Sequence, residues 1–349
     1  MNTRILKIDS DNIDKEKIQE AAKVIREGEL VAFPTETVYG LGANGLDEVA
    51  VEKIYKAKGR PSDNPLILHI SSLEEIVPLV EDIPPIAYRC MEKFWPGPLT
   101  MIFKRSKIIP DIITGGLDTV AIRMPDHPIA SRFIKASGVP IAAPSANTSG
   151  RPSPTKADHV IEDMQGKIPM IIDGGSTGIG LESTVLDMSI DTPMILRPGG
   201  ITIEELRKII PDISLDRSIV QKDAVPKSPG QKYRHYAPKA EMILFTGDIE
   251  SMVREINKYA DDYISRGKKV GIISTYETKD RYNDNNKLVA ICGSRKEPES
   301  IAVNLFSVIR GFDSSDVDII LAEGVSIDNI GMAIMNRMLK AAGGKIIKL

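Results

Sequence analysis

The N-terminal part of the chain alternates between short apolar runs and segments whose apolar residues recur at helical spacing. Short apolar runs are typical of buried strands, and those at residues 30–33 and 66–70 enclose a predicted helix that Asp47 caps and Gly59 ends. The same pattern predicts strands at residues 99–104, 119–124, 139–143, 169–173, 183–188 and 194–196, and helices at residues 14–27, 72–80, 85–94, 127–137, 155–164 and 203–210. We therefore expect residues 1–210 to form one domain built of strands and helices.

The C-terminal part of the chain repeats strand and helix in turn. Strands are predicted at residues 242–245, 269–274, 288–292 and 317–322, and helices at residues 249–266, 300–310 and 332–342. Alternation of this kind is typical of a small parallel α/β domain, which we place at residues 240–349. We find no group of residues there that indicates chemistry.

Residues 211–239 lack apolar periodicity and are predicted to link the two domains. Their last part, KSPGQKYRHYAPK at residues 227–239, is dense in cations and aromatic side chains. A plain linker is usually rich in Gly and Ser or in acidic residues. We therefore expect this linker to fold over the active site.

Polar side chains gather at strand ends and in loops of residues 1–210, and Tyr236 joins them from the linker. Arg123, for example, stands just before Pro125, where its strand must stop, and strand ends are where open α/β sheets bind ligands. Cations are plentiful among these residues, whereas carboxylates are scarce. Such a set suits a reaction run by positioning and charge stabilisation, above all attack on a nucleotide phosphate. The set comprises Thr37, Lys58, Arg60, Asn64, His69, Thr119, Arg123, Ser145, Asn147, Ser183, Arg197 and Tyr236.

Two glycine-rich stretches resemble nucleotide-binding motifs, but each is weak evidence for nucleotide binding. Gly40, Gly42 and Gly45 match G-x-G-x-x-G, but the preceding apolar run ends at Phe33, so no dinucleotide site is expected there. The loop at residues 174–180, GGSTGIG, can approach phosphate through its backbone N–H groups. It lacks the Lys-Ser/Thr ending of a P-loop.

Composition narrows the class of protein. A length of 349 residues suits two domains or three, and a net charge of −3 argues against stable binding of long nucleic acid. The two cysteines, Cys90 and Cys292, lie far apart, so neither a metal site nor a disulfide framework is expected. The N-terminus lacks the apolar core of a signal peptide, and no apolar run approaches 18 residues. We expect a cytoplasmic protein without a membrane span.

Four motifs make the chain resemble a known family. They are PTETVYGLG at residues 34–42, KAKGRPSDNPL at 56–66, PSAN at 144–147 and KYRHYAPK at 232–239. In these motifs the chain is similar to threonylcarbamoyl-AMP synthases of the two-domain form with a YrdC-like catalytic domain. The resemblance implies an open, twisted, mixed α/β sheet with helices, followed by a smaller Rossmann-like parallel α/β domain.

The resemblance also implies an activity. Such enzymes condense L-threonine, bicarbonate or CO2, and ATP into threonylcarbamoyl-AMP, with release of pyrophosphate and with Mg²⁺ accompanying the ATP. The threonine amine traps CO2 as a carbamate, which attacks the α-phosphorus without a covalent enzyme intermediate. The adenylate then serves the downstream machinery that makes threonylcarbamoyladenosine (t6A) in tRNA.

The same resemblance assigns roles to residues of this sequence. Lys58 and Arg60 would be the catalytic cations, because they suit the charge that develops on departing pyrophosphate. Arg123 suits a carboxylate, which guanidinium pairs bidentately. The residues that would hold L-threonine are Thr37, His69, Arg123, Ser145 and Ser183, and those that would hold ATP are Lys58, Arg60, Asn64, Thr119, Asn147, Thr155, Arg197 and Tyr236.

Two other functions remain open at this point. A carbamoyl transferase of hydrogenase maturation uses a similar module but also carries zinc-finger cysteines, and this chain has only two cysteines. An RNA-binding module associated with translation or the ribosome would bind RNA in a salt-dependent manner. The synthase predicts instead a pyrophosphate release that needs threonine, bicarbonate and ATP together.

Overall fold

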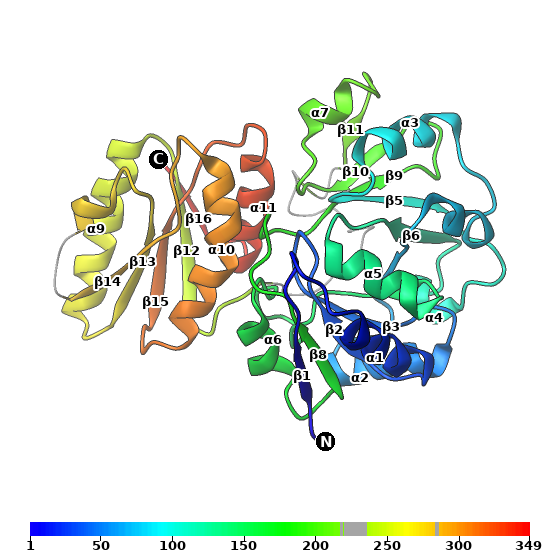
Figure 1. The fold of residues 1–349 in the computed structure, drawn as a ribbon. Coiled ribbons are helices and arrows are strands. Elements are labelled where there is room, and N and C mark those ends of the chain that lie inside the picture. Colours follow the sequence, from blue (N-terminus) through cyan, green and yellow to red (C-terminus); the bar gives the residue numbers. More distant parts are fainter. Residues whose placement is uncertain (217–218, 220–235, 283–285) are drawn as a thin grey trace. The chain divides into compact units, whose positions relative to one another are not determined.

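The computed structural model describes residues 1–216, 219, 236–282 and 286–349 (Figure 1). They fall into two compact units, and each is considered by itself. The first contains the described residues of 1–149 and 153–219, and the second contains residues 150–152 together with the described residues from 236 to 349. Most of the predicted linker at 211–239 lies outside the described residues, so its folding over an active site stays a prediction.

The first unit is built on an eleven-stranded sheet in the order β1-β8-β2-β3-β7-β4-β6-β5-β9-β10-β11. Strand β4 runs parallel to β6 and antiparallel to β7, so the sheet is mixed, as the resemblance implied. The strands are β1 (Arg4–Lys7), β2 (Val31–Phe33), β3 (Gly40–Asn44), β4 (Ile67–His69), β5 (Leu99–Lys104), β6 (Thr119–Arg123), β7 (Ile141–Ala142), β8 (Met170–Asp173), β9 (Thr184–Asp187), β10 (Met194–Arg197) and β11 (Ser214–Leu215).

Helices cover this sheet and are fixed by local signals that the sequence carries. In α2, the Asp47 side chain accepts hydrogen bonds from the first-turn amides, and Gly59 ends the helix with φ of +63°. The core on one side packs α1 and α5 against β2 and β8 through Ile25, Phe133 and Phe33. The helices are α1 (Lys15–Arg26), α2 (Glu48–Lys58), α3 (Pro85–Phe94), α4 (Asp111–Thr114), α5 (Pro128–Ser137), α6 (Ala157–Met164) and α7 (Ile203–Arg207), and a 3-10 helix, η1, spans Leu73–Leu79.

The glycines of G-x-G-x-x-G belong to a β-hairpin, because Gly40 and Gly42 lie in β3, which pairs antiparallel with β2. A Cβ at Gly42 would stand 2.8 Å from Ile141 Cγ2, and a Cβ at Gly45 would stand 2.9 Å from the Pro140 carbonyl oxygen. These glycines therefore allow close packing of neighbouring strands and do not form a dinucleotide-binding turn. The strand itself was not predicted, since its glycines hide the apolar pattern.

Other local predictions need correction. The segment predicted as an α-helix at 72–80 is the 3-10 helix η1, which contains Pro78. Helix α6 (Ala157–Met164) begins after its cap at Lys156, so the helix predicted from residue 155 starts two residues later than expected. The short edge strands β1 and β11 were missed because their residues are largely exposed and show no apolar run.

The second unit contains a five-stranded, fully parallel sheet in the order β14-β13-β15-β12-β16. This confirms the predicted small parallel α/β fold. Its strands are β12 (Glu241–Thr246), β13 (Val270–Ser274), β14 (Lys287–Ile291), β15 (Ile319–Glu323) and β16 (Ile346–Lys348), and its helices are α9 (Ile249–Ser265), η2 (Lys279–Tyr282), α10 (Pro298–Asp313) and α11 (Gly331–Ala341). None of the helices within the described ranges is long and apolar enough to cross a membrane.

Three residues from within the predicted first domain belong to this second unit. The Ala237 amide donates to the Gly150 carbonyl over 2.9 Å, and Arg310 donates to the Pro152 carbonyl over 2.6 Å. Arg151 also pairs with Asp313 at 3.4 Å. The chain therefore passes through the second unit only a few residues after the PSAN motif.

Candidate active site

Three neighbouring strands of the first unit, β4, β6 and β5, present polar side chains from one face of the sheet. His69 stands opposite Arg123, and Arg123 stands opposite Thr100. Directly opposite residues on paired strands share a face. All three are buried. Arg123 therefore does not face solvent, and Thr100 joins the site although the sequence analysis missed it inside an apolar strand.

Arg123 is held by an acidic partner. Its NH2 nitrogen lies 2.7 Å from Glu36 Oε1, and its Nε donates to the Gly97 carbonyl over 3.3 Å. Glu36 follows β2, between Thr35 and Thr37 of the PTETVYGLG motif. The site thus contains a carboxylate that the sequence analysis overlooked, and the signal for it was an acid between two threonines after a buried strand.

His69 is fully enclosed and uncharged at neutral pH. Its ring packs edge-on to Phe33 with 6.1 Å between ring centroids, and Nδ1 lies 3.2 Å from the Ile67 carbonyl oxygen. Burial, and then the nearby charge of Arg123, lower the pKa of His69 from 6.5 to about 3. His69 can therefore offer a hydrogen bond to a ligand, but it adds no positive charge to the site.

A hydroxyl cluster adjoins Arg123. Ser183 Oγ lies 2.7 Å from Thr100 Oγ1, and Arg197 NH2 donates to Ser183 Oγ over 3.1 Å. Arg197 also donates through Nε and NH2 to the Ser183 carbonyl, over 3.0 and 2.9 Å. Arg197 and Ser183, predicted to bind ATP and threonine respectively, are thus in direct contact.

The PSAN loop forms a second group with the end of α2. The Lys58 ammonium donates to the backbone carbonyls of Ser145 and Asn147, the latter over 2.6 Å. Ser145 Oγ donates to Asn147 Oδ1 over 2.5 Å. Arg60 NH2 donates to the Asn64 carbonyl over 3.2 Å. The two predicted catalytic cations therefore hold the backbone of site loops in this structure.

The glycine-rich loop at residues 174–180 lies against the PTETVYGLG motif. The Ile179 amide donates to the Glu36 carbonyl over 2.8 Å, and the Gly180 amide donates to the Thr37 carbonyl over 3.1 Å. Thr37 Oγ1 lies 2.9 Å from Thr35 Oγ1. Some of the amides that this loop would need for a phosphate are thus already bonded to protein.

Two threonine hydroxyls stand out near this loop. The Thr177 amide donates to the Thr155 carbonyl over 3.0 Å, so the two residues are neighbours. Both side-chain oxygens are buried, and neither has a hydrogen-bond partner among the described residues. Buried hydroxyls are normally satisfied, so these two are available to a ligand. Thr155 was among the predicted ATP residues, and Thr177 was not.

Two predicted residues, Thr119 and Tyr236, remain to be described. Thr119 begins β6, whereas Arg123 ends it, so their backbones are separated by roughly 13 Å at the usual rise of a strand. Tyr236 belongs to the second unit, where its ring stacks on Phe306 with 5.1 Å between centroids and lies 5.7 Å from the Arg337 guanidinium carbon. Among the described residues, no group of three or more His, Cys, Asp or Glu side chains could hold a metal ion.

Comparison with known proteins identifies the family. Residues 23–199 match the Sua5/YciO/YrdC model, described as "Telomere recombination", and residues 201–343 match the model described as "Threonylcarbamoyl-AMP synthase, C-terminal domain". The chain is 50% identical over 342 residues to the threonylcarbamoyl-AMP synthase of Pyrococcus abyssi, which covers 97% of this chain and 98% of that relative. The chain belongs to the threonylcarbamoyl-AMP synthase family. The family assignment made from the motifs is thereby confirmed.

Further relatives of this family support the assignment. The threonylcarbamoyl-AMP synthase of Bacillus subtilis is 48% identical over 333 residues, covering 95% of this chain and 94% of the relative. The crystal structure of P. abyssi Sua5 complexed with L-threonine superposes with a TM-score of 0.94 at 50% identity, covering 99% of this chain and 100% of that one. The predicted fold class and the prediction of an enzyme are confirmed.

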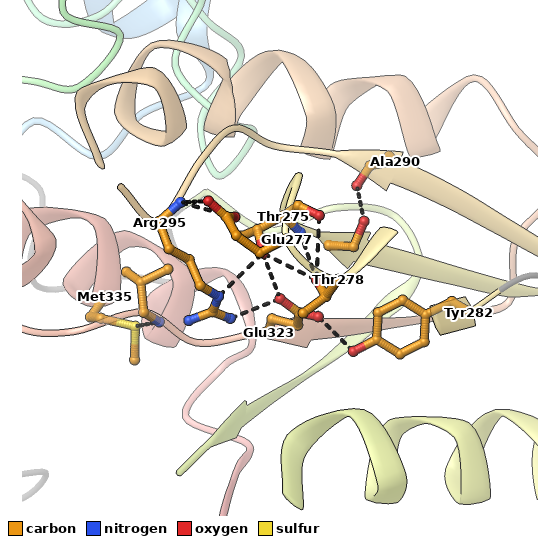
Figure 2. Close-up of polar contacts among 10 residues, drawn as sticks. Thr275, Glu277, Thr278, Tyr282, Ala290, Arg295, Glu323 and Met335 are labelled. Carbon is orange, nitrogen blue, oxygen red and sulfur yellow. Dashed lines mark hydrogen bonds and ion pairs between the residues drawn. The ribbon is translucent and has the colours of Figure 1, made fainter. Parts of the chain in front are cut away.

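The second unit of this synthase-family chain contains a buried polar cluster that the sequence analysis did not predict (Figure 2). Glu323, at the end of β15, accepts from Tyr282 OH over 2.6 Å and from Thr275 Oγ1 over 3.2 Å, and it pairs with Arg295 NH2 at 2.7 Å. Burial, and then the neighbouring Glu323 charge, raise the pKa of Tyr282, so the phenol stays protonated and donates. Since the Glu323 oxygens are satisfied within the cluster, its role is to hold the strand ends together.

The Arg295–Glu323 pair should stabilise the second unit strongly. The Glu323 side chain is 1% exposed, so Arg295→Met leaves a buried carboxylate without its counter-ion and should cost about 3–5 kcal/mol. Hydrogen exchange of the β13 and β15 amides measures this loss. Arg281→Met is the control, because its partner Glu250 is exposed and protection should hardly change. Equal effects of the two variants would contradict the structural role.

The His69 imidazole should not titrate where histidine ordinarily does. In an NMR titration its Cε1–H resonance, assigned with a His69→Gln variant, should stay unchanged from pH 8 to pH 5. The unfolded chain takes up this proton near pH 6.5 and the folded chain only near pH 3. Stability therefore falls as the pH drops below 6.5, by about 1.4 kcal/mol per pH unit for this group. A resonance that titrates near pH 6.5 would contradict the described burial.

Proposed function

We propose that this protein synthesises threonylcarbamoyl-AMP from L-threonine, bicarbonate or CO2, and ATP, and releases pyrophosphate. The observation that carries the proposal is the buried Arg123, flanked by His69 and the Ser183 hydroxyl on one face of the sheet. A buried guanidinium beside hydroxyl groups suits a small hydroxylated carboxylate such as threonine. The P. abyssi relative of known structure was solved with L-threonine bound.

In this proposal the threonine site contains Thr37, His69, Arg123, Ser145 and Ser183. Arg123 takes the substrate carboxylate in a bidentate pair. The neutral His69 ring and the hydroxyl groups accept or donate hydrogen bonds to the rest of the molecule. None of these groups acts as a nucleophile, because the amine of threonine itself attacks CO2 to give the carbamate.

The ATP site places cations around the phosphates. The carbamate oxygen attacks the α-phosphorus, a new P–O bond forms, and the bond to the β-phosphate oxygen breaks. Lys58, Arg60 and Arg197 stabilise the charge that develops on the departing pyrophosphate. Mg²⁺ would accompany ATP on its phosphates and would supply charge neutralisation there, a mode of binding that does not require a cage of protein carboxylates. The remaining ATP contacts in this proposal are Asn64, Thr119, Asn147, Thr155 and Tyr236.

The product determines the partner. Threonylcarbamoyl-AMP is a mixed anhydride, which water destroys, so an acceptor enzyme must take it up promptly. We place that acceptor in the machinery that transfers the threonylcarbamoyl group to adenosine of tRNA to form t6A, and we place both reactions in the cytoplasm.

One assay tests this function directly. The protein is mixed with ATP, L-threonine and bicarbonate, each component is omitted in turn, and the adenylate is sought by mass spectrometry. The synthase should form the adenylate only in the complete mixture. Pyrophosphate release without threonine, or salt-dependent RNA binding with no adenylate, would contradict the proposal and favour a different enzyme or the RNA-binding module.

Arg60 should be essential for the chemical step. Loss of one preorganised charge at a departing phosphate typically costs about 100- to 1,000-fold in rate. We therefore expect Arg60→Ala to lower pyrophosphate release by at least about 100-fold. The control is Lys56→Ala in the last turn of α2, four residues before Arg60, because Lys56 is exposed and lies outside the site. Wild-type turnover in Arg60→Ala, with circular dichroism unchanged, would refute the role of this cation.

A further inference from the structure

The ion pair between Glu36 and Arg123 leaves one carboxylate oxygen without a donor. Only 12% of the Glu36 side chain and 5% of the Arg123 side chain are exposed. Glu36 Oε1 lies 2.7 Å from Arg123 NH2, whereas Oε2 is buried and accepts no hydrogen bond within the described ranges. A buried carboxylate oxygen without a donor is costly. This oxygen is suited to a ligand that brings an N–H group.

The fold keeps Glu36 in this position. Its carbonyl accepts from the Ile179 amide over 2.8 Å, so the glycine-rich loop fixes its backbone. The hydroxyls of Thr35 and Thr37, on either side of Glu36, hydrogen-bond to each other at 2.9 Å. This contact therefore does not direct either hydroxyl toward the Glu36 carboxylate. The carboxylate is therefore held beside the guanidinium that is proposed to bind the substrate.

Charge balance decides which ligand fits. An α-amino acid is a zwitterion, with a carboxylate for Arg123 and an ammonium for Glu36. When it enters between the two residues, one buried ion pair becomes two, and the net charge of the site does not change. A carboxylic acid without an amine would take Arg123 and leave Glu36 buried without a counter-ion, which is strongly unfavourable.

We propose that Glu36 binds the α-ammonium group of the amino-acid substrate and so selects α-amino acids over hydroxy acids that lack an amine. This inference rests on the proposed function and deepens it, because it adds the anionic half of the threonine site. To react with CO2 the ammonium loses one proton to solvent before the N–C bond forms and a second after it, so the carbamate nitrogen keeps one hydrogen and can donate it to Glu36. The contact therefore persists up to the attack on ATP.

The test compares two ligands and two variants by isothermal titration calorimetry. The ligands are L-threonine and 3-hydroxybutyrate, which is threonine without its amine. In Glu36→Gln, the Kd for threonine should rise about 10- to 100-fold, as expected for the loss of a charged hydrogen bond. Binding of 3-hydroxybutyrate should become tighter, because Arg123 loses its competing carboxylate. Glu52→Gln, at an exposed position of α2, should change neither constant.

Each outcome decides the matter. Glu36→Gln that binds both ligands more tightly would mean that Glu36 only competes for Arg123, and an unchanged Kd for threonine would mean that it makes no contact with the ammonium. Should this variant fail to fold, the wild-type protein still tests the inference, since equal affinity for the two ligands would overturn it. Wild-type protein that binds no threonine would contradict the proposed function itself, and this inference with it.

Discussion

A buried positive charge must be paired, and Arg123 is the charge around which the first unit arranges its polar groups. It is buried at the end of β6, beside His69 and Thr100, so the cost of removing its guanidinium from water must be offset locally. Glu36 supplies the opposite charge from the loop after β2, and the Gly97 carbonyl supplies an acceptor. Burial first, and then the charge of Arg123, lower the pKa of His69 and keep its ring neutral.

Short strands make such a site possible. Strand β4 has three residues and β7 has two. Because these strands are so short, the loops at their two ends are separated by only a few residues of strand. Lys58 ties the end of α2 to the PSAN loop, and the amides of Ile179 and Gly180 tie the glycine-rich loop to the PTETVYGLG motif. A cation therefore fixes one loop of the site, and backbone hydrogen bonds fix another.

What the sequence could predict depends on whether the signal is local. Helix α2 was predicted with its limits because Asp47 and Gly59 are signals carried by single residues. Strand β3 was missed because its glycines, Gly40 and Gly42, are required by close packing against residues distant in the sequence, such as Ile141. In the site, the motifs indicated most of the cations and hydroxyls. Thr100 and the Glu323 cluster were missed because their partners come from remote parts of the chain, whereas Glu36 was overlooked although it stands between two threonines of the PTETVYGLG motif.

The central claim is that the buried guanidinium on β6 receives the amino-acid substrate, and the threonine affinity of Arg123→Gln tests it most directly. This variant keeps a polar side chain of similar reach but removes the charge. Calorimetry should then detect no threonine binding up to millimolar concentration, while ATP still binds. Threonine affinity equal to that of the wild-type protein would contradict the account.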